Sequence, residues 1–242
     1  AQYTDIVDPM DGSLMVKMPN TQSDELQPFV DSLAGVPKTG LHNAFKNPER
    51  FVQLGEVSHK AGAMLSDPDV AHFFTRCIQR VCPKSYAQAM GEVTVTAQFL
   101  KNFGGDGVRF MAQDFGVSGD HGGQHSRGFR WPYGPVALVS PFNFPLEIPG
   151  LQVMGAIFMG NKPCLKAAST VSLVMEQFLL MLHACGLPED NVDLLHCGGR
   201  VMGEFIDRAP VRVTQFTGSS DIGEQLAVQT AGKIKLEDAG VD

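Results

Sequence analysis

The spacing of hydrophobic residues changes along the chain and predicts two kinds of structure. In the first part, apolar residues recur three or four positions apart, as at Val70, Phe73 and Cys77, which is the pattern of one face of an α-helix. Directly before this stripe, Asp67-Pro68 supplies a capping side chain and a proline suited to the first helical turn. We expect three helical stretches. The first begins at the cap Asn47, which Pro48 follows, and the second begins at the cap Asp67. The third runs from about Ser85 to Phe115, with a break at Gly104-Gly105.

From Pro135 onward, short apolar strands alternate with single helices. The predicted strands cover 135–140, 163–167, 192–195, 212–216 and 233–236, and the predicted helices cover 146–159, 171–185, 201–208 and 221–230. Each helix returns the chain to the same edge of the sheet, so consecutive strands pair in parallel. The pattern therefore predicts an α/β fold with a parallel sheet of about five strands, in which ligands bind at the carboxyl ends of the strands.

The segments that precede this sheet differ from it in amino-acid composition. Residues 1–40 are rich in Pro, Gly, Asp and Ser and predict short strands and loops that lie on another part of the molecule. Glycines and polar residues dominate from Val117 to Trp131, where Gly122-Gly123 predicts a turn between two strands, the second containing 128–131. We therefore divide the chain into strands and helices over 1–116, a hairpin region over 117–134 and an α/β domain over 135–242.

Composition excludes several classes of function. The formal net charge of -7 and the pI near 5.5 argue against nucleic acid as a partner, because phosphate binding needs a basic face. Apolar runs are too short to span a membrane. No Cys/His set has metal-ligand spacing, and we expect the five cysteines to be reduced, buried thiols. No Arg-rich or apolar leader follows Ala1, so the residues themselves do not reveal the compartment.

Polar or glycine-rich segments follow four of the predicted strands, at 140–145, 166–169, 216–223 and 237–240. Because parallel strands end at one edge, we expect these segments to line a common crevice. Asn143, in a turn fixed by prolines, is suited to donate a hydrogen bond to a developing oxyanion. Glu237 ends an apolar strand and is suited to act as a general base, with an exposed strand-end acid as the alternative.

Two of these segments carry features of an anion site. The chain has no GxGxxG fingerprint and no P-loop lysine, but Gly218-Ser219 precedes a predicted helix whose first N–H groups can face a phosphate. A simple capping role for Ser219 or Ser220 is the alternative. Lys166 ends an apolar strand, where its ammonium group either reaches water or binds an anion or a sugar hydroxyl.

Four motifs resemble, in their order and approximate spacing, those of the aldehyde dehydrogenase superfamily. They are Pro141-Phe-Asn-Phe-Pro-Leu146, Gly160-Asn-Lys-Pro-Cys-Leu-Lys166, Phe216-Thr-Gly-Ser219 and Leu236-Glu237. The segments 37–43, 83–86, 128–134 and 235–240 are similar to the plant-type Δ1-pyrroline-5-carboxylate dehydrogenases. The resemblance covers essentially the whole chain, but only about the first half of such an enzyme.

The resemblance implies that NAD lies across the strand ends in a Rossmann-like domain. The residues that would contact it are Ser140, Pro141, Phe142, Lys166, Ser169, Gly198, Ser219 and Ile222. Lys166 would bond the adenosine ribose, and Ser219 would meet the pyrophosphate. Ile222 would lie near the adenine, for which Gly198 would make room. Ser169 stands where many relatives have an acid that binds the ribose hydroxyls, which leaves the preference for NAD over NADP open.

Catalytic roles are implied by the same resemblance. Asn143 would donate to the oxyanion of a thiohemiacetal, and Glu237 would activate water to hydrolyse the thioester. The chemistry also needs a thiolate nucleophile, which in this family would lie a few dozen residues beyond Glu237 and therefore beyond Asp242. Among the five cysteines, only Cys197 at a strand end is not excluded by its position. We therefore expect that this polypeptide by itself does not oxidise aldehydes.

Two functions are compatible with these observations. In the first, the chain is part of an NAD-dependent dehydrogenase of proline catabolism, which oxidises L-glutamate γ-semialdehyde to glutamate in the mitochondrial matrix. In the second, it is a non-catalytic relative kept as a structural subunit of a larger mitochondrial complex. Under both hypotheses we expect association with other protein subunits, because the stretch 117–134 matches the hairpin that joins subunits in the superfamily.

Overall fold

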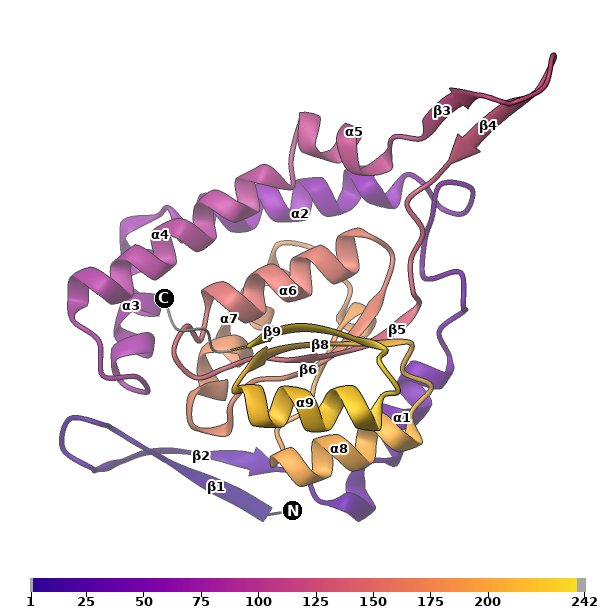
Figure 1. Ribbon diagram of the computed structural model, residues 1–242. Coiled ribbons are helices and arrows are strands. Elements are labelled where there is room, and N and C mark those ends of the chain that lie inside the picture. The colour runs from indigo at the N-terminus through magenta and orange to yellow at the C-terminus, as the bar shows by residue number, and fades with distance from the viewer. Residues whose placement is uncertain (1, 239–242) are drawn as a thin grey trace.

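A parallel five-stranded sheet lies at the centre of the structure, a computed structural model that describes residues 2–238 (Figure 1). Within these residues the strand order is β7-β6-β5-β8-β9, and every neighbouring pair is parallel. The strands are β5 (Pro135–Val139), β6 (Lys162–Lys166), β7 (Asp193–Leu194), β8 (Val213–Gly218) and β9 (Ile234–Asp238). The predicted α/β fold with a parallel sheet is confirmed.

Four helices connect these strands and cover both faces of the sheet. They are α6 (Glu147–Phe158), α7 (Ser172–Ala184), α8 (Gly199–Arg208) and α9 (Ser220–Gln229), each within one or two residues of its predicted ends. Alternate residues of β5 point to opposite faces, as in any strand. Val136 and Leu138 join the core that α6 and α7 share, whereas Ala137 joins the core of α8 and α9. Figure 1 shows these two helix pairs on opposite sides of the sheet.

A helical segment packs on the α6 and α7 side. It consists of α2 (Arg50–Leu65), α3 (Pro68–Gln79), α4 (Tyr86–Asn102) and α5 (Asp106–Ala112). The cap Asp67 is confirmed, because its carboxylate accepts hydrogen bonds from the N–H groups of Asp69 and Val70. The predicted break is also confirmed, since Gly105 separates α4 from α5 with a φ of 53°.

The capping role predicted for Asn47 is wrong. The helix α2 begins at Arg50, and Asn47 has a left-handed φ of 51° instead of the extended conformation of an N-cap. Its side-chain amide donates to the carbonyl of Leu41 at 3.4 Å, which closes a turn before the helix. Because the side chain of Asn47 binds the carbonyl of Leu41, it does not cap the helix.

The first forty residues contain one helix that their composition did not predict. The strands β1 (Gln2–Val7) and β2 (Leu14–Asn20) form an antiparallel pair, and α1 (Gln27–Ala34) follows a short 3-10 turn at Ser23–Glu25. Leu33 of α1 is fully buried in the α8 core. The hydroxyl of Ser32 also contacts Lys162 Nζ at 2.6 Å, so a tertiary contact to the start of β6 fixes α1.

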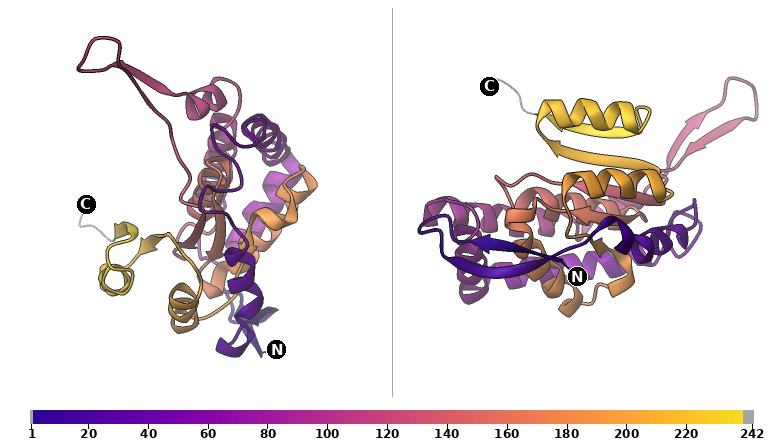
Figure 2. Two further views of the ribbon diagram at one scale, coloured as in Figure 1. Left: turned by 90° about the vertical axis from the view of Figure 1, so that its right-hand side faces the viewer. Right: turned by 90° about the horizontal axis from the view of Figure 1, so that it is seen from below.

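The hairpin formed by β3 (Phe115–Ser118) and β4 (His125–Gly128) extends away from the rest of the molecule, as Figures 1 and 2 show. Every residue of both strands is exposed. The strand β3 begins at Phe115, where the sequence predicted the end of a helix, and β4 ends at Gly128, before the predicted end at Trp131.

Within residues 2–238, no helix has both the length and the apolar character needed to cross a bilayer.

We predict that acidification destabilises the fold through His42. This ring is fully buried, with Nε2 2.9 Å from the Phe158 carbonyl and Nδ1 accepting from Arg50 Nε at 3.3 Å. Burial lowers the pKa of His42 below its ordinary value of 6.5. The folded state therefore binds fewer protons than the unfolded chain below pH 6.5, and stability falls as the pH falls from 6.5 toward the folded pKa.

Thermal unfolding between pH 7.5 and pH 5.5 measures this effect. The melting temperature should fall, and it should fall less in His42→Gln, which has no imidazole to protonate. His59→Gln, an exposed histidine of α2, serves as the matched control. Equal pH dependence of the parent and His42→Gln would contradict the prediction.

Candidate functional site

The carboxyl ends of the parallel strands lie at one edge of the sheet and carry the predicted polar residues. Val139, the last residue of β5, pairs with Lys166 on one side and with Phe216 on the other. Phe216 pairs with Leu236, and Thr217 pairs with Glu237. Ser140, Lys166, Ser219 and Glu237 therefore lie at or just beyond the same edge, which we call the carboxyl edge.

Lys166 is the last residue of β6 and is half-buried at this edge. Burial lowers the pKa of its ammonium group, an effect that the neighbouring Cys197 partly opposes. The backbone carbonyl of Lys166 accepts the N–H of Ser140 at 3.2 Å, which ties the start of the 140–145 loop to β6. Ser140 is buried, and its hydroxyl has no hydrogen-bond partner within residues 2–238. Of these two side chains, Lys166 is the one that a ligand at this edge can reach directly, because it is only half-buried.

The loop that carries Asn143 is anchored by a buried carboxylate from another part of the chain. Glu92 Oε1 accepts hydrogen bonds from the N–H groups of Leu146 at 2.8 Å and Glu147 at 3.2 Å, at the start of α6. Its other oxygen pairs with Lys84 Nζ at 2.7 Å. The same ammonium group lies 3.9 Å from the centre of the Phe144 ring, so it also contacts the loop directly.

Asn143 itself is exposed, as are its neighbours Phe142 and Phe144, which are 63% and 40% accessible. The sequence placed Asn143 in an apolar turn, but the described residues do not enclose it. Pro145 is buried and Pro141 is half-buried, so the ends of the loop are fixed while its centre faces outward. The amide of Asn143 therefore faces a surface that another part of a protein or a ligand can cover.

Glu237 lies in β9 and is exposed. Its carboxylate accepts a hydrogen bond from Thr217 Oγ1 at 3.1 Å, and Thr217 in turn accepts one from Gln152 Nε2 at 2.9 Å. Gln152 of α6, Glu147 and Glu237 line a cavity of about 310 Å³. Burial, with help from the charge of Glu92, raises the pKa of Glu147. The Ala239-Gly240 part of the predicted motif lies outside the described residues.

The loop after β7 meets the end of β6 beside Lys166. Ser169 Oγ donates to the Cys197 carbonyl at 3.2 Å, and Gly198 follows as the N-cap of α8. A Cβ atom on Gly198 would meet no other atom within 4 Å, so the packing of the described chain does not require a glycine there. The surface beside Gly198 is open.

The helix α9 begins at the carboxyl edge immediately after β8. Ser219 has the extended backbone of an N-cap, with φ -72° and ψ 146°, yet its side chain makes no capping hydrogen bond. The simple capping explanation therefore does not account for Ser219. One turn further, Ile222 is 46% exposed on the same helix.

Sequence reasoning missed Glu92, Lys84, Thr217 and Gln152 as parts of this site. Glu92 had a detectable signal, because it occupies an interior position of α4 among Ala89, Val93 and Thr96, where an acid is rarely buried without a partner. The backbone groups that it binds lie 54 residues away at Leu146 and 55 residues away at Glu147, and no local pattern could name them.

The sequence profile described as the Aldehyde dehydrogenase family matches residues 2–241. The chain belongs to the aldehyde dehydrogenase family. Within this family it is 56% identical, over 237 residues, to a probable aldehyde dehydrogenase of Linum usitatissimum. It is also 54% identical, over 242 residues, to Delta-1-pyrroline-5-carboxylate dehydrogenase 12A1, mitochondrial, of Arabidopsis thaliana. These matches cover 98% and 100% of this chain but 43% and 44% of the relatives, so the chain spans less than half of their length.

Solved structures show that the fold is that of aldehyde dehydrogenases. An E. coli NADP-dependent enzyme matches with a TM-score of 0.85 and 22% identity, over 99% of this chain and 48% of that one. A betaine aldehyde dehydrogenase of Staphylococcus aureus, in complex with NAD+, matches with a TM-score of 0.82 and 14% identity, over 99% of this chain and 47% of that one. At these identities the likeness shows the fold alone.

None of the five cysteines of this aldehyde dehydrogenase chain is suited to act as a thiolate nucleophile. Burial raises the pKa of all five thiols, namely those of Cys77, Cys82, Cys164, Cys185 and Cys197. Cys197, which the sequence left open, is 3% exposed and has its pKa raised to about 11. Since the thiolate is the reactive form, Cys197 stays protonated and unreactive at neutral pH.

We predict that Glu92→Ala lowers the free energy of unfolding by about 3–5 kcal/mol, because it removes one member of a buried ion pair. Lys84 would lose its partner, and the N–H groups of Leu146 and Glu147 would lose their acceptor. Urea denaturation followed by circular dichroism measures the change.

Glu56→Ala, an exposed acid on α2, is the matched control and should change stability by less than about 0.5 kcal/mol. A similarly small change in Glu92→Ala would show that the network is not an anchor.

Proposed function

We propose that the chain is the cofactor-binding part of a dehydrogenase that oxidises L-glutamate γ-semialdehyde to glutamate with NAD. The convergence of Ser140, Lys166, Ser219 and Glu237 at the carboxyl edge carries this proposal, because dinucleotides bind across that edge in open α/β sheets. The substrate is proposed from the 54% identity to a relative whose name is Delta-1-pyrroline-5-carboxylate dehydrogenase.

Several observations at the carboxyl edge fit a dinucleotide. Ser140 has an unpartnered buried hydroxyl, and the side chain of Ser219 does not cap the first N–H groups of α9, which can face a pyrophosphate. The open surface beside Gly198 leaves room for a base. Lys166 would donate to a ribose hydroxyl, Ile222 would meet the adenine, and Pro141 and Phe142 would line the same crevice. Bound NAD would serve as the acceptor of hydride from the substrate.

Ser169 bears on the choice between NAD and NADP. A serine has no carboxylate that would repel the 2′-phosphate of NADP. The hydroxyl of Ser169 donates a hydrogen bond to the Cys197 carbonyl. NAD is the cofactor that we propose from membership of the aldehyde dehydrogenase family, and the titration described below compares the two dinucleotides directly.

The catalytic roles assigned to Asn143 and Glu237 complete the proposal. An exposed amide on a loop with fixed ends can donate to an oxyanion once the rest of the active site covers it. Glu237 would act as the general base, and the hydrogen bond from Thr217 would orient its carboxylate. The nucleophilic thiolate and the aldehyde-binding surface would both come from the part of such a dehydrogenase that this chain does not span.

We further propose that the protein works in the mitochondrial matrix as an oligomer. The compartment follows the name of the Arabidopsis relative. The hairpin region 117–134 would join subunits, because β3 and β4 are exposed throughout and an isolated two-stranded hairpin is only marginally stable in water.

Titration of NAD into the purified chain, followed by calorimetry, tests the cofactor site. We expect saturable binding that Lys166→Ala weakens by about tenfold, since a hydrogen bond from a charged donor contributes about 1.5–3 kcal/mol. A parallel titration with NADP measures the preference between the two.

The matched control is Lys101→Ala, an exposed lysine in the last turn of α4, which should bind NAD as the parent does. If Lys166→Ala and Lys101→Ala bind NAD with the same affinity, the assignment of Lys166 is wrong. If the parent binds neither dinucleotide, the proposed cofactor site fails.

Association through the hairpin is tested by Val117→Asp, which places a charge on an apolar side chain that is 62% exposed. We expect the parent to elute as an oligomer and the variant to shift toward the 26.1 kDa monomer in size-exclusion chromatography with light scattering. Leu180→Asp alters an apolar residue on α7 that is 58% exposed, and it should leave the oligomer intact. A parent that is monomeric at high concentration would refute the proposal.

A further inference from the structure

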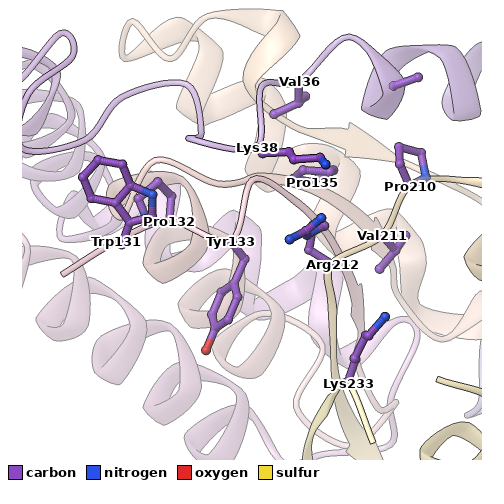
Figure 3. A pocket seen from close by; sticks show the side chains of 11 residues that line it. Val36, Lys38, Trp131, Pro132, Tyr133, Pro135, Pro210, Val211, Arg212 and Lys233 are labelled. Carbon is purple, nitrogen blue, oxygen red and sulfur yellow. The ribbon is translucent and has the colours of Figure 1, made fainter. Parts of the chain in front are cut away.

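A second cavity, of about 760 Å³, lies at the amino edge of the sheet, opposite the carboxyl edge. Its walls include Pro135 at the start of β5, Arg212 directly before β8 and Lys233 directly before β9. A strand of five residues spans about 16 Å, so this cavity is separated from the proposed cofactor site by the length of the sheet. Figure 3 shows the side chains that line it.

Three cationic side chains line this cavity, namely Lys38, Arg212 and Lys233. Figure 3 shows Lys38, Arg212 and Lys233 among the side chains that surround the cavity. Residues 2–238 contain other cations that are paired, such as Lys84 with Glu92 and Lys162 with Asp193. No acidic group of the described chain pairs with any of the three cations in the cavity.

Three cations without an acidic partner among residues 2–238 line one cavity of a chain whose formal charge is -7. Like charges gathered in one concave space repel one another unless an anion lies between them. All three side chains are exposed, so water screens this repulsion in the free protein and an anion can reach them. The arrangement therefore favours an occupant with negative charge.

The backbone of two of these cations, Arg212 and Lys233, is held in place by hydrogen bonds of the sheet. The N–H of Arg212 donates to the carbonyl of Pro135 at 2.9 Å, and the carbonyl of Lys233 accepts from Thr214 at 2.9 Å. Both residues are thus fixed by the sheet. A guanidinium group fixed at its base offers two parallel N–H donors to a carboxylate or a phosphate.

Aromatic residues form another wall of the cavity. Trp131 and Tyr133, which are 46% and 47% exposed, line it together with Pro132. Lys235 lies 5.3 Å from the centre of the Tyr133 ring, which adds a further positive charge near this wall. A ligand that carries negative charge on an organic body can thus contact both cations and apolar surface. The volume falls within the range of small-molecule sites, about 300–1,000 Å³.

We propose that this amino-edge cavity binds a small organic or inorganic anion with at least two negative charges, carried by carboxylate or phosphate groups. Arg212 binds one anionic group through its two parallel donors, and Lys38 and Lys233 neutralise the remaining charge. The site is independent of the proposed cofactor site, because no residue of one lines the other.

Intrinsic fluorescence tests the proposal, since Trp131 is the only tryptophan in the sequence and lines the cavity. Pyrophosphate and citrate are titrated separately into the whole chain at low ionic strength, against sodium chloride matched for ionic strength. We expect a saturable change with at least one of the two anions and none with chloride. Lys38→Gln combined with Lys233→Gln should weaken binding by about tenfold or more. Arg212→Lys should also weaken it, because the forked donor is lost.

Two controls separate this site from the cofactor site. Lys101→Gln, outside the cavity, and Lys166→Ala, at the opposite edge, should both keep the affinity of the parent for the anion. Circular dichroism of the double variant confirms that it folds. The proposal is overturned if neither anion changes the fluorescence in the millimolar range, if the double variant binds as the parent does, or if Lys166→Ala abolishes the change. Failure of NAD to bind would leave this result unaffected.

Discussion

Parallel pairing of the strands is the constraint on which the arrangement of the molecule depends. Because each crossover helix returns the chain to the same side, all strands of the sheet run in one direction and end together. Residues that are far apart in sequence, such as Lys166 and Glu237, thereby come to a shared edge. The same constraint gathers the starts of the strands, and with them Arg212 and Lys233, at the other edge. Parallel pairing of the strands therefore produces two edges of the sheet that differ in chemistry.

The helical segment contributes to the carboxyl edge as well as to the core. Glu92 reaches from α4 to the first N–H groups of α6, where a helix favours negative charge, and Lys84 neutralises it. The exposed Asn143 lies on the loop between β5 and this anchored helix start. The position of a proposed catalytic amide therefore depends on a buried ion pair that belongs to a different part of the chain.

The sequence predicted the sheet well because its strands form short, largely apolar runs that alternate with helices, and the two central strands β5 and β6 are buried over most of their length. It also predicted which residues follow those strands, since the order of elements alone places them at the carboxyl edge. The helix α1 was missed because its stability comes from contacts of Leu33 and Ser32 with distant elements. The cap at Asn47 was wrong because a hydrogen bond to Leu41 favoured a turn. The backbone partners of Glu92 and the cationic cavity depend on tertiary contacts, which no window of local sequence contains.

The shared core of the helices and the sheet limits how the chain can be divided. Val136 and Leu138 of β5 pack into the same apolar cluster as Phe51, Phe74 and Val93 of the preceding helices. A shortened version starting at Pro135 would present this cluster to solvent and would leave α6 without the carboxylate that holds its first turn. The parallel sheet with its four connecting helices is therefore not a unit that can be separated from the preceding helices. The helices before Pro135 and the sheet that follows have to be expressed and engineered together.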